Sequence, residues 1–163
     1  MRPYILILVL ALLSSCGGSK GDSLPPSNSS GFPDVSGRYN LVYKAATLTC
    51  AGQSDTMKET SSNMVIDQDA NVLYFRSEGS NETPGMHLLE ATESKGYIQK
   101  NGSFTMTFVA VIQYDAVGIV DYSELMSGNF HSTGCTGSSS VTLFYRSYGI
   151  ACTAKPAVEC TRI

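Results

Sequence analysis

Residues 97–114 read YIQKNGSFTMTFVAVIQY and contain the clearest structural pattern in the chain. Asn101-Gly102 stands between two runs of alternating polar and apolar residues, and this dipeptide favours the tight turn of a β-hairpin. After the turn, apolar residues occupy every second position from Phe104 to Tyr114, as in a strand with one buried face. The stretch therefore predicts two antiparallel strands joined by a short turn.

The same two-residue period recurs along most of the chain, and no stretch has a helical period. We expect eight strands, at 37–48, 56–67, 71–78, 86–100, 103–114, 118–131, 138–148 and 150–161. The fourth of them should contain a bulge or break near Ser94–Gly96. Eight strands in sequence, joined mostly by tight turns, predict an all-β fold: an antiparallel meander closed into a small barrel. A flattened β-sandwich is the alternative.

Composition and charge narrow the possible functions. The chain has 163 residues, of which 42% are hydrophobic and only 15% are charged, as expected for one folded domain and not for a disordered protein. Its formal net charge is −3, so it lacks the excess of basic residues that binding to nucleic acid requires. We therefore expect no nucleic-acid partner.

Residues 4–13 form an unbroken apolar run, YILILVLALL, that follows the positively charged Arg2. A helix of this length covers only about half of the ~30 Å hydrocarbon core of a bilayer, because each residue adds ~1.5 Å. The run is therefore typical of a signal peptide and not of a transmembrane helix.

Leu13-Ser14-Ser15-Cys16 ends this leader and resembles the lipobox of bacterial lipoproteins. The resemblance implies that the leader is cleaved before Cys16, and that lipid chains on this residue anchor the protein to a membrane. Gly17 follows, where lipoproteins retained at the inner membrane typically have Asp, so the resemblance implies the outer membrane of the cell envelope. An ordinary secretory leader is the alternative.

These observations divide the chain into three segments. Residues 1–15 are the expected signal peptide, and residues 16–34 are the lipidated Cys16 with a flexible tether rich in Gly, Ser, Pro and Asn. Residues 35–163 form the expected barrel domain, which is long enough to bury a single core.

Four cysteines remain apart from the one in the lipobox, and an even number in an exported protein favours two disulfides. In a closed meander of eight strands, the first and last strands are antiparallel neighbours. The predicted disulfides are therefore Cys50–Cys152 and Cys135–Cys160. Pro156 could make the last strand irregular, which leaves Cys50–Cys135 with Cys152–Cys160 as the alternative.

The sequence contains none of the common catalytic or cofactor-binding motifs. It lacks G-x-S-x-G, H-E-x-x-H, G-x-G-x-x-G and a P-loop. His87 and His131 are far apart in the chain, and His131 is expected at a strand end. The cysteines show neither C-x-x-C spacing nor a histidine at metal-ligand spacing. We therefore expect no enzyme activity, no cofactor and no metal.

One partial match to a calcium-binding loop has a simpler interpretation. Asp67, Asp69, Asn71 and Glu78 occupy positions 1, 3, 5 and 12 of the loop template. Position 6 is Val72, where the template requires Gly, and the flanking residues have a strand pattern. We expect a polar hairpin turn here.

The inward side chains of the barrel are either a packed core or the lining of a ligand cavity, since small barrels do both. The inward candidates are Tyr39, Leu41, Tyr43, Phe104, Met106, Phe108, Ile112, Tyr114, Leu143 and Tyr145. Ser36-Gly37-Arg38-Tyr39-Asn40 resembles the Gly-x-aromatic start of lipocalin-like barrels, with Tyr in place of the usual Trp. This resemblance implies the barrel more strongly than it implies a ligand.

The expected function is that of a membrane-anchored, non-enzymatic envelope lipoprotein. Its barrel would bind a small apolar ligand, or serve a structural or interaction role with another envelope protein. The alternative is an inhibitor of lysozyme-type envelope hydrolases, because the chain is similar to such inhibitors in size, anchor and disulfide content. Their characteristic loop, rich in Ser, Gly and aromatic residues, corresponds loosely to Ser123–Gly137.

Overall fold

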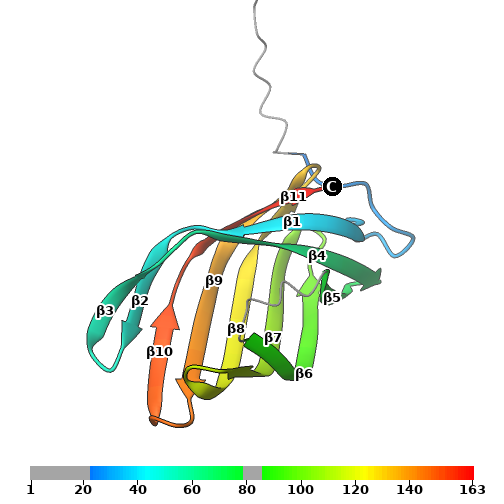
Figure 1. The fold of residues 1–163 in the computed structure, drawn as a ribbon. Helices are drawn as coiled ribbons and strands as arrows, with labels where there is room; N and C mark the ends of the chain where they lie inside the picture. The colour runs from blue at the N-terminus through cyan, green and yellow to red at the C-terminus, as the bar shows by residue number, and fades with distance from the viewer. Residues whose placement is uncertain (1–22, 79–85) are drawn as a thin grey trace, which may run out of the picture.

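The computed structural model describes residues 23–78 and 86–163, which form strands joined by turns and loops (Figure 1). In chain order the strands are β1 (Gly37–Tyr43), β2 (Ala46–Cys50), β3 (Gln53–Met57), β4 (Thr60–Asp69), β5 (Val72–Glu78), β6 (Met86–Ile98), β7 (Ser103–Tyr114), β8 (Gly118–His131), β9 (Gly134–Tyr145), β10 (Ile150–Ala154) and β11 (Ala157–Arg162). All of them belong to one antiparallel sheet. No helix in the described ranges has the length and hydropathy needed to cross a membrane.

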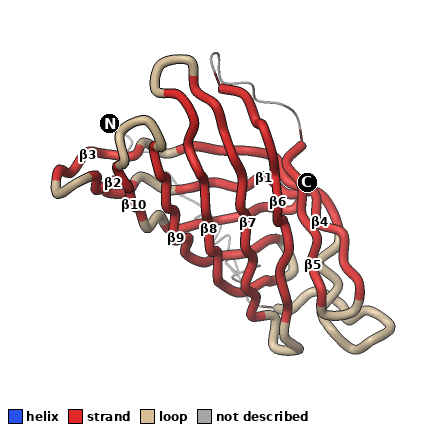
Figure 2. Tube along the Cα trace, turned by 90° about the horizontal axis from the view of Figure 1, so that it is seen from below, coloured by secondary structure: helices blue, strands red, loops and turns tan. Residues whose placement is uncertain are grey.

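Eight strands of this sheet close into a barrel. Around the ring they follow the order β1, β4, β5, β6, β7, β8, β9 and β11, and the ring closes because β11 pairs with both β9 and β1. Figure 2 shows β6 to β9 side by side as one continuous wall. The other strands, β2, β3 and β10, extend the sheet beyond β9 and stand to one side in Figure 1. The prediction of an antiparallel barrel is confirmed, and the sandwich alternative is wrong.

Three of the predicted strands are interrupted, which is why the sheet has more than eight. Pro156 separates β10 from β11, because proline has no N–H to donate to a neighbouring strand. At this break β9 changes partner, so that Gly134–Ser138 pairs with β11 and Val141–Tyr145 pairs with β10. Further breaks at residues 44–45 and 58–59 separate β1 from β2 and β3 from β4. Together they let β2, β3 and β10 leave the barrel as a side extension.

The irregularity expected in the fourth strand lies earlier than predicted. β6 has register shifts against β7 between residues 88 and 90 and between residues 91 and 93, whereas residues 94–96 pair regularly. β6 nevertheless remains a single strand. The number of barrel strands therefore stays even, and the first and last strands remain antiparallel neighbours.

Both predicted disulfides are present. Cys50 and Cys152 face each other across β2 and β10, with Cα atoms 4.2 Å apart. Cys135 and Cys160 do the same across β9 and β11, at 4.8 Å. Such distances are close to the ~4.5 Å between directly opposed residues of an antiparallel pair that exchange no backbone hydrogen bonds. They are shorter than the ~5.5–6 Å that is commonest in disulfides.

Residues 23–36 form a lid over one end of the barrel, and we call them the N-terminal lid. Pro33 and Val35 are fully buried. The Gln68 side chain holds this segment in place, because its Oε1 accepts from Val35 N–H (2.9 Å) and its Nε2 donates to the Pro33 carbonyl (3.0 Å). Asn28 donates a further side-chain hydrogen bond to the β4–β5 turn (3.1 Å). The predicted flexible tether is thus wrong for this part, and the folded domain begins by residue 23.

The core fills the barrel beneath the N-terminal lid, at what we call the packed end. The Phe130 ring centroid lies 4.6 Å from that of Phe104 and 5.9 Å from that of Tyr39. Tyr39 Oη donates to the Val35 carbonyl (2.8 Å), which ties β1 to the lid. The core residues are Val35, Tyr39, Leu41, Met64, Ile66, Leu73, Ile98, Phe104, Met106, Met126, Phe130, Cys135, Val158 and Cys160. The Cys135–Cys160 disulfide is therefore part of this core.

A pair of glycines brings β8 and β9 into close approach beside this core. Gly128 and Gly137 are directly opposed in the sheet. A Cβ atom on either residue would lie 2.1 or 2.2 Å from a backbone carbonyl oxygen of the opposite strand. A glycine inside a strand commonly marks such a close backbone approach or a sharp bend. This wall of the packed end therefore depends on both residues having no side chain.

Candidate functional site

The opposite end of the barrel, which we call the hollow end, contains a cavity of about 780 Å³. The cavity lies between the first residues of β4 and β6, the last residues of β5 and β7, and the middle of β8. Its lining consists of Leu41, Tyr43, Thr60, Ser61, Ser62, Asn63, Met64, Phe75, Arg76, Ser77, His87, Leu88, Met106, Phe108, Ile112, Tyr114, Tyr122, Glu124 and Met126. The barrel interior is thus filled at one end and hollow at the other.

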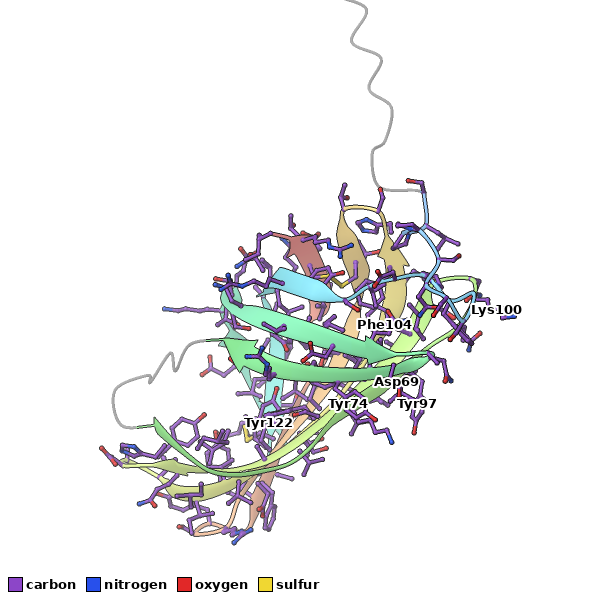
Figure 3. All side chains as sticks on the ribbon, turned by 90° about the vertical axis from the view of Figure 1, so that its right-hand side faces the viewer. Asp69, Tyr74, Tyr97, Lys100, Phe104 and Tyr122 are labelled. Atoms are coloured by element: carbon purple, nitrogen blue, oxygen red, sulfur yellow. A yellow bond between two sulfur atoms is a disulfide. The ribbon has the colours of Figure 1, made fainter. Side chains whose placement is uncertain are left out.

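The cavity exists because two neighbouring strands separate. β5 pairs with β6 only from Val72↔Tyr97 to Tyr74↔Lys95, although both strands continue beyond these pairs. Their outer neighbours remain paired, β4 with β5 and β6 with β7. Figure 3 shows the β4–β5 pair standing apart from the wall that contains β6 to β8, with Tyr122 between the two. Phe75 of β5 still approaches Phe108 of β7 across this gap, but the described side chains leave the rest of the space between the two sides empty.

The structure places the predicted inward residues at both ends, and Leu41 and Met106 belong to both the core and the cavity wall. Those on the cavity wall are Leu41, Tyr43, Met106, Phe108, Ile112 and Tyr114. Tyr39 and Phe104 belong to the core instead, because the N-terminal lid closes that end. Leu143 and Tyr145 are not on the wall either, because β9 there pairs with β10, the strand that leaves the barrel.

Aromatic side chains dominate the deep part of the wall. The Phe108 and Tyr122 ring centroids lie 5.5 Å apart in an edge-to-face arrangement, which is a favoured geometry for aromatic pairs. Phe75, on β5, approaches Phe108, and the centroids of the two rings are 6.4 Å apart. The polar residues of β4 and the last residues of β5 surround the outer part of the cavity. The site therefore has an apolar, aromatic interior and a polar rim.

Several wall residues were missed by the sequence analysis, and the most unusual of them is Glu124 on β8. Its side chain points into the barrel, and the residue is only 5% exposed. A signal was present, because Val120, Tyr122 and Met126 have the same inward parity in the strand. An acidic residue among apolar inward positions is uncommon, since burying a charge is costly.

Hydroxyl groups from three strands surround the Glu124 carboxylate. Tyr122 Oη and Tyr43 Oη donate to Oε2, at 2.7 and 3.2 Å, and Ser139 Oγ donates to Oε1 at 2.6 Å. Burial, and then the negative charge of Glu124, raise the pKa of Tyr43 and of Tyr122 well above the ordinary value. Both phenols therefore stay protonated and act as donors. Among the ion pairs of the described residues, none includes Glu124.

No protein-family model matches this chain, and neither a curated protein nor a solved structure is significantly similar to it. The assignment of a function to the cavity therefore depends on the geometry and chemistry of the cavity itself.

The two histidines lie in different parts of the molecule. His87 is near the start of β6, and its Nε2 is 3.7 Å from Asp115 Oδ1. His131 is the last residue of β8, as the sequence predicts, and its Nδ1 is 3.2 Å from Thr133 Oγ1. β6 and β8 run in the same direction, because each is antiparallel to β7. The start of one and the end of the other therefore lie at opposite ends of the barrel.

The residues that match the calcium-loop template lie in a hairpin. Asp67 and Asp69 are on β4, Glu78 is at the end of β5, and residues 70–71 form the turn between the strands. The interpretation as a hairpin turn is confirmed. Asp67 pairs with Tyr74, so Glu78 lies four residues, or roughly 13 Å, farther along an extended strand. Within the described ranges, no group of three or more His, Cys, Asp or Glu residues is placed to hold a metal ion.

Two further predictions concern other parts of the chain. The leader and the lipobox, including Cys16, lie outside the described residues. The stretch Ser123–Gly137, which suggested an inhibitory loop, forms the second half of β8 and the start of β9 with a short turn between them. These residues are therefore part of the barrel wall and do not form a long loop.

Proposed function

We propose that this protein is a non-enzymatic, membrane-anchored binding module that holds one small, largely apolar ligand in the hollow end of its barrel. The cavity carries this proposal. Its volume of about 780 Å³ falls within the ~300–1,000 Å³ of typical small-molecule sites. Its deep wall is aromatic and aliphatic, and few polar groups interrupt it, which is the usual composition of such sites.

The division of the barrel interior supports a binding role over simple packing. Eight-stranded barrels either fill their interior with side chains or hold one small ligand. This barrel fills only the packed end, where large side chains meet beneath the N-terminal lid. At the hollow end, the described residues of β5 and β6 separate early, and we take this gap as the route by which a ligand enters from the side.

The N-terminal sequence supports a location at the membrane surface. The apolar leader and the lipobox-like Leu13–Cys16 favour a lipid anchor on Cys16 in the outer membrane of a cell envelope. An anchored binding module would exchange apolar molecules beside a bilayer. Cys16→Ser is expected to move the protein into soluble fractions. If this variant still sedimented with membranes in a fractionation experiment, the proposed lipid anchor would be contradicted.

The experiment that tests the proposed cavity uses residues 17–163, which lack the leader and Cys16, purified without detergent; we call this protein the unlipidated form. N-phenyl-1-naphthylamine, a neutral apolar fluorophore, is titrated into it. Ile112→Trp places a large side chain in the cavity wall, and we expect it to weaken binding at least about tenfold. A tenfold loss of affinity corresponds to roughly 1.4 kcal/mol of binding free energy.

The matched control places the same side chain on the outside of the barrel. Leu125 on β8 is 52% exposed, so Leu125→Trp should leave the affinity within about twofold, or roughly 0.4 kcal/mol. The chain has no native tryptophan, so each variant also carries a unique fluorescence donor. Energy transfer from the introduced tryptophan to the probe would locate the bound molecule. Failure of the unlipidated form to bind the probe, or equal binding by both variants, would contradict the proposal.

A further inference from the structure

The buried carboxylate in the cavity indicates which chemical class of ligand the site favours. This inference rests on the proposed binding function. Glu124 is 5% exposed and lines the cavity beside Tyr43 and Tyr122. A buried acidic side chain is normally paired with a base or a metal ion. Here the donors that the described residues supply are hydroxyl groups, which provide hydrogen bonds but no positive charge.

The hydrogen bonds to Glu124 leave room for one more donor. A carboxylate has about four lone-pair positions. Oε2 uses two of them for the tyrosine hydroxyls, and Oε1 uses one for Ser139. By this count the carboxylate can accept one more hydrogen bond, and Glu124 lines the cavity. An N–H donor that carries positive charge would also balance the negative charge of the carboxylate.

The aromatic wall favours the same kind of group. The ring faces of tyrosine and phenylalanine attract cations, and this attraction is stronger where water is excluded. Tyr43, Phe108 and Tyr122 lie on the wall around the carboxylate or beside its partners. Because both phenols remain protonated, they add no negative charge of their own.

We propose that the cavity selects amphipathic cations, molecules with a protonated amine on an apolar body, and that Glu124 binds the amine. The apolar body then lies along the aromatic and aliphatic wall toward the opening between β5 and β6. Arg76 and His87, the basic residues of the lining, are 65% and 59% exposed at their side chains and face Asp67 and Asp115. They are placed at the rim, where they would favour an anionic group outside the cavity.

The test compares three ligands that have the same ten-carbon chain. Decylammonium, decan-1-ol and decanoate are each used to displace N-phenyl-1-naphthylamine from the unlipidated form at pH 7. We expect decylammonium to bind at least about tenfold more tightly than decan-1-ol, and decanoate to bind most weakly. Glu124→Gln should remove the advantage of the amine while decan-1-ol keeps its affinity within about twofold.

The control for the loss of charge is Glu159→Gln, at a side chain that is 57% exposed and pairs with Lys44 outside the cavity. It should leave the order of the three ligands unchanged. Glu124→Asp retains the charge but withdraws it by one methylene group, so an intermediate preference is expected. If Glu124→Gln does not fold, the test still stands on two measurements. They are the ratio of the affinities for decylammonium and decan-1-ol in the parent protein, and the same ratio in Glu124→Asp.

The outcomes separate this inference from the proposed function. Equal displacement by decylammonium and decan-1-ol would overturn selection for amines and leave the apolar cavity intact. An amine preference that persists in Glu124→Gln would overturn the role of Glu124. Stronger displacement by decanoate would assign the head group to the basic rim and also overturn the proposal. No probe binding at all would instead contradict the proposed function.

Discussion

The two ends of the barrel interior use similar residues with different results. At the packed end, Phe130 meets Phe104 and Tyr39 at centroid distances of 4.6 and 5.9 Å, and the N-terminal lid covers them. At the hollow end, Phe75 and Phe108 are 6.4 Å apart and border an open cavity. The difference arises from the backbone, because one end is closed by a lid and the other is opened by the separation of β5 from β6. Inward parity alone therefore does not distinguish a core residue from a cavity residue.

Truncating one phenylalanine at each end should produce the largest contrast in stability. Phe130 is 2% exposed, so Phe130→Ala should lower the free energy of unfolding by about 3–5 kcal/mol, as is typical for core phenylalanines. Phe108→Ala removes a ring that already borders empty space and should cost about 1 kcal/mol. Denaturant titration of the unlipidated form measures both. Equal losses would show that the hollow end is packed as tightly as the other.

Much of the fold could be predicted from the sequence because its determinants are local. The alternation of apolar and polar residues, as from Phe104 to Tyr114, predicts the strands, and the turn residues predict where they are separated. Their even number makes the chain ends antiparallel neighbours, which is sufficient to predict both disulfides. The interruption at Pro156 had a visible signal, but the exchange of partners that it permits depends on the whole sheet.

The determinants of the cavity are non-local, so the sequence indicated it only in part. The segment from Ser23 to Ser36 resembles a linker in composition, and its role as a lid depends on hydrogen bonds to Gln68 and the β4–β5 turn. Nothing in the residues of β5 and β6 indicates where their pairing ends. Glu124 had a signal in its inward parity, but its hydroxyl donors come from β1, β8 and β9, which only the closed barrel brings together.

Removing the disulfide at the packed end should be the next largest effect. Cys135 and Cys160 are 25 residues apart and both are buried in the core. Cys135→Ala with Cys160→Ala should lower the free energy of unfolding by about 3–4 kcal/mol, because the unfolded chain loses a constraint. The affinity for the neutral probe should persist wherever the variant is folded, since neither residue lines the cavity. Loss of probe binding by the folded variant would show that the two ends are not independent.

Alkaline pH should weaken the protein through the hollow end. Burial and Glu124 raise the pKa of Tyr43 and of Tyr122 above the ordinary 10.0. The unfolded chain therefore loses these protons first as pH rises. Above about pH 10 the free energy of unfolding should fall by up to ~1.4 kcal/mol per pH unit for each of the two residues, and this contribution is fully present at lower pH.

The variants for this prediction are Tyr122→Phe, which should make the decline above pH 10 less steep, and Tyr148→Phe as the control. Tyr148 is 59% exposed and lies in the β9–β10 turn, away from the cavity. Burial also raises the pKa of Tyr39 and of Tyr114, so part of the decline should remain. Melting temperatures between pH 8 and 11 give the slopes. Identical slopes for the two variants would contradict the environment described for Tyr122.

The smallest expected effect concerns the turn that anchors the lid. Ala70 has a φ of 52°, in the left-handed region that costs a residue with a Cβ about 1–2 kcal/mol. Ala70→Gly should therefore raise the free energy of unfolding by about 0.5–1 kcal/mol after the added flexibility of the unfolded chain is subtracted. Ala116→Gly, in the β7–β8 turn without a positive φ, should instead be neutral or slightly destabilising. Calorimetry that finds the opposite order would contradict this description of the turn.

The most direct test of the central claim, that the hollow end holds one apolar molecule, is native mass spectrometry of the unlipidated form with N-phenyl-1-naphthylamine. We expect one bound probe per chain, the same stoichiometry for Leu125→Trp, and a lost or strongly reduced complex for Ile112→Trp. A protein that binds no probe, or an Ile112→Trp variant that binds as much as its parent, would contradict the claim.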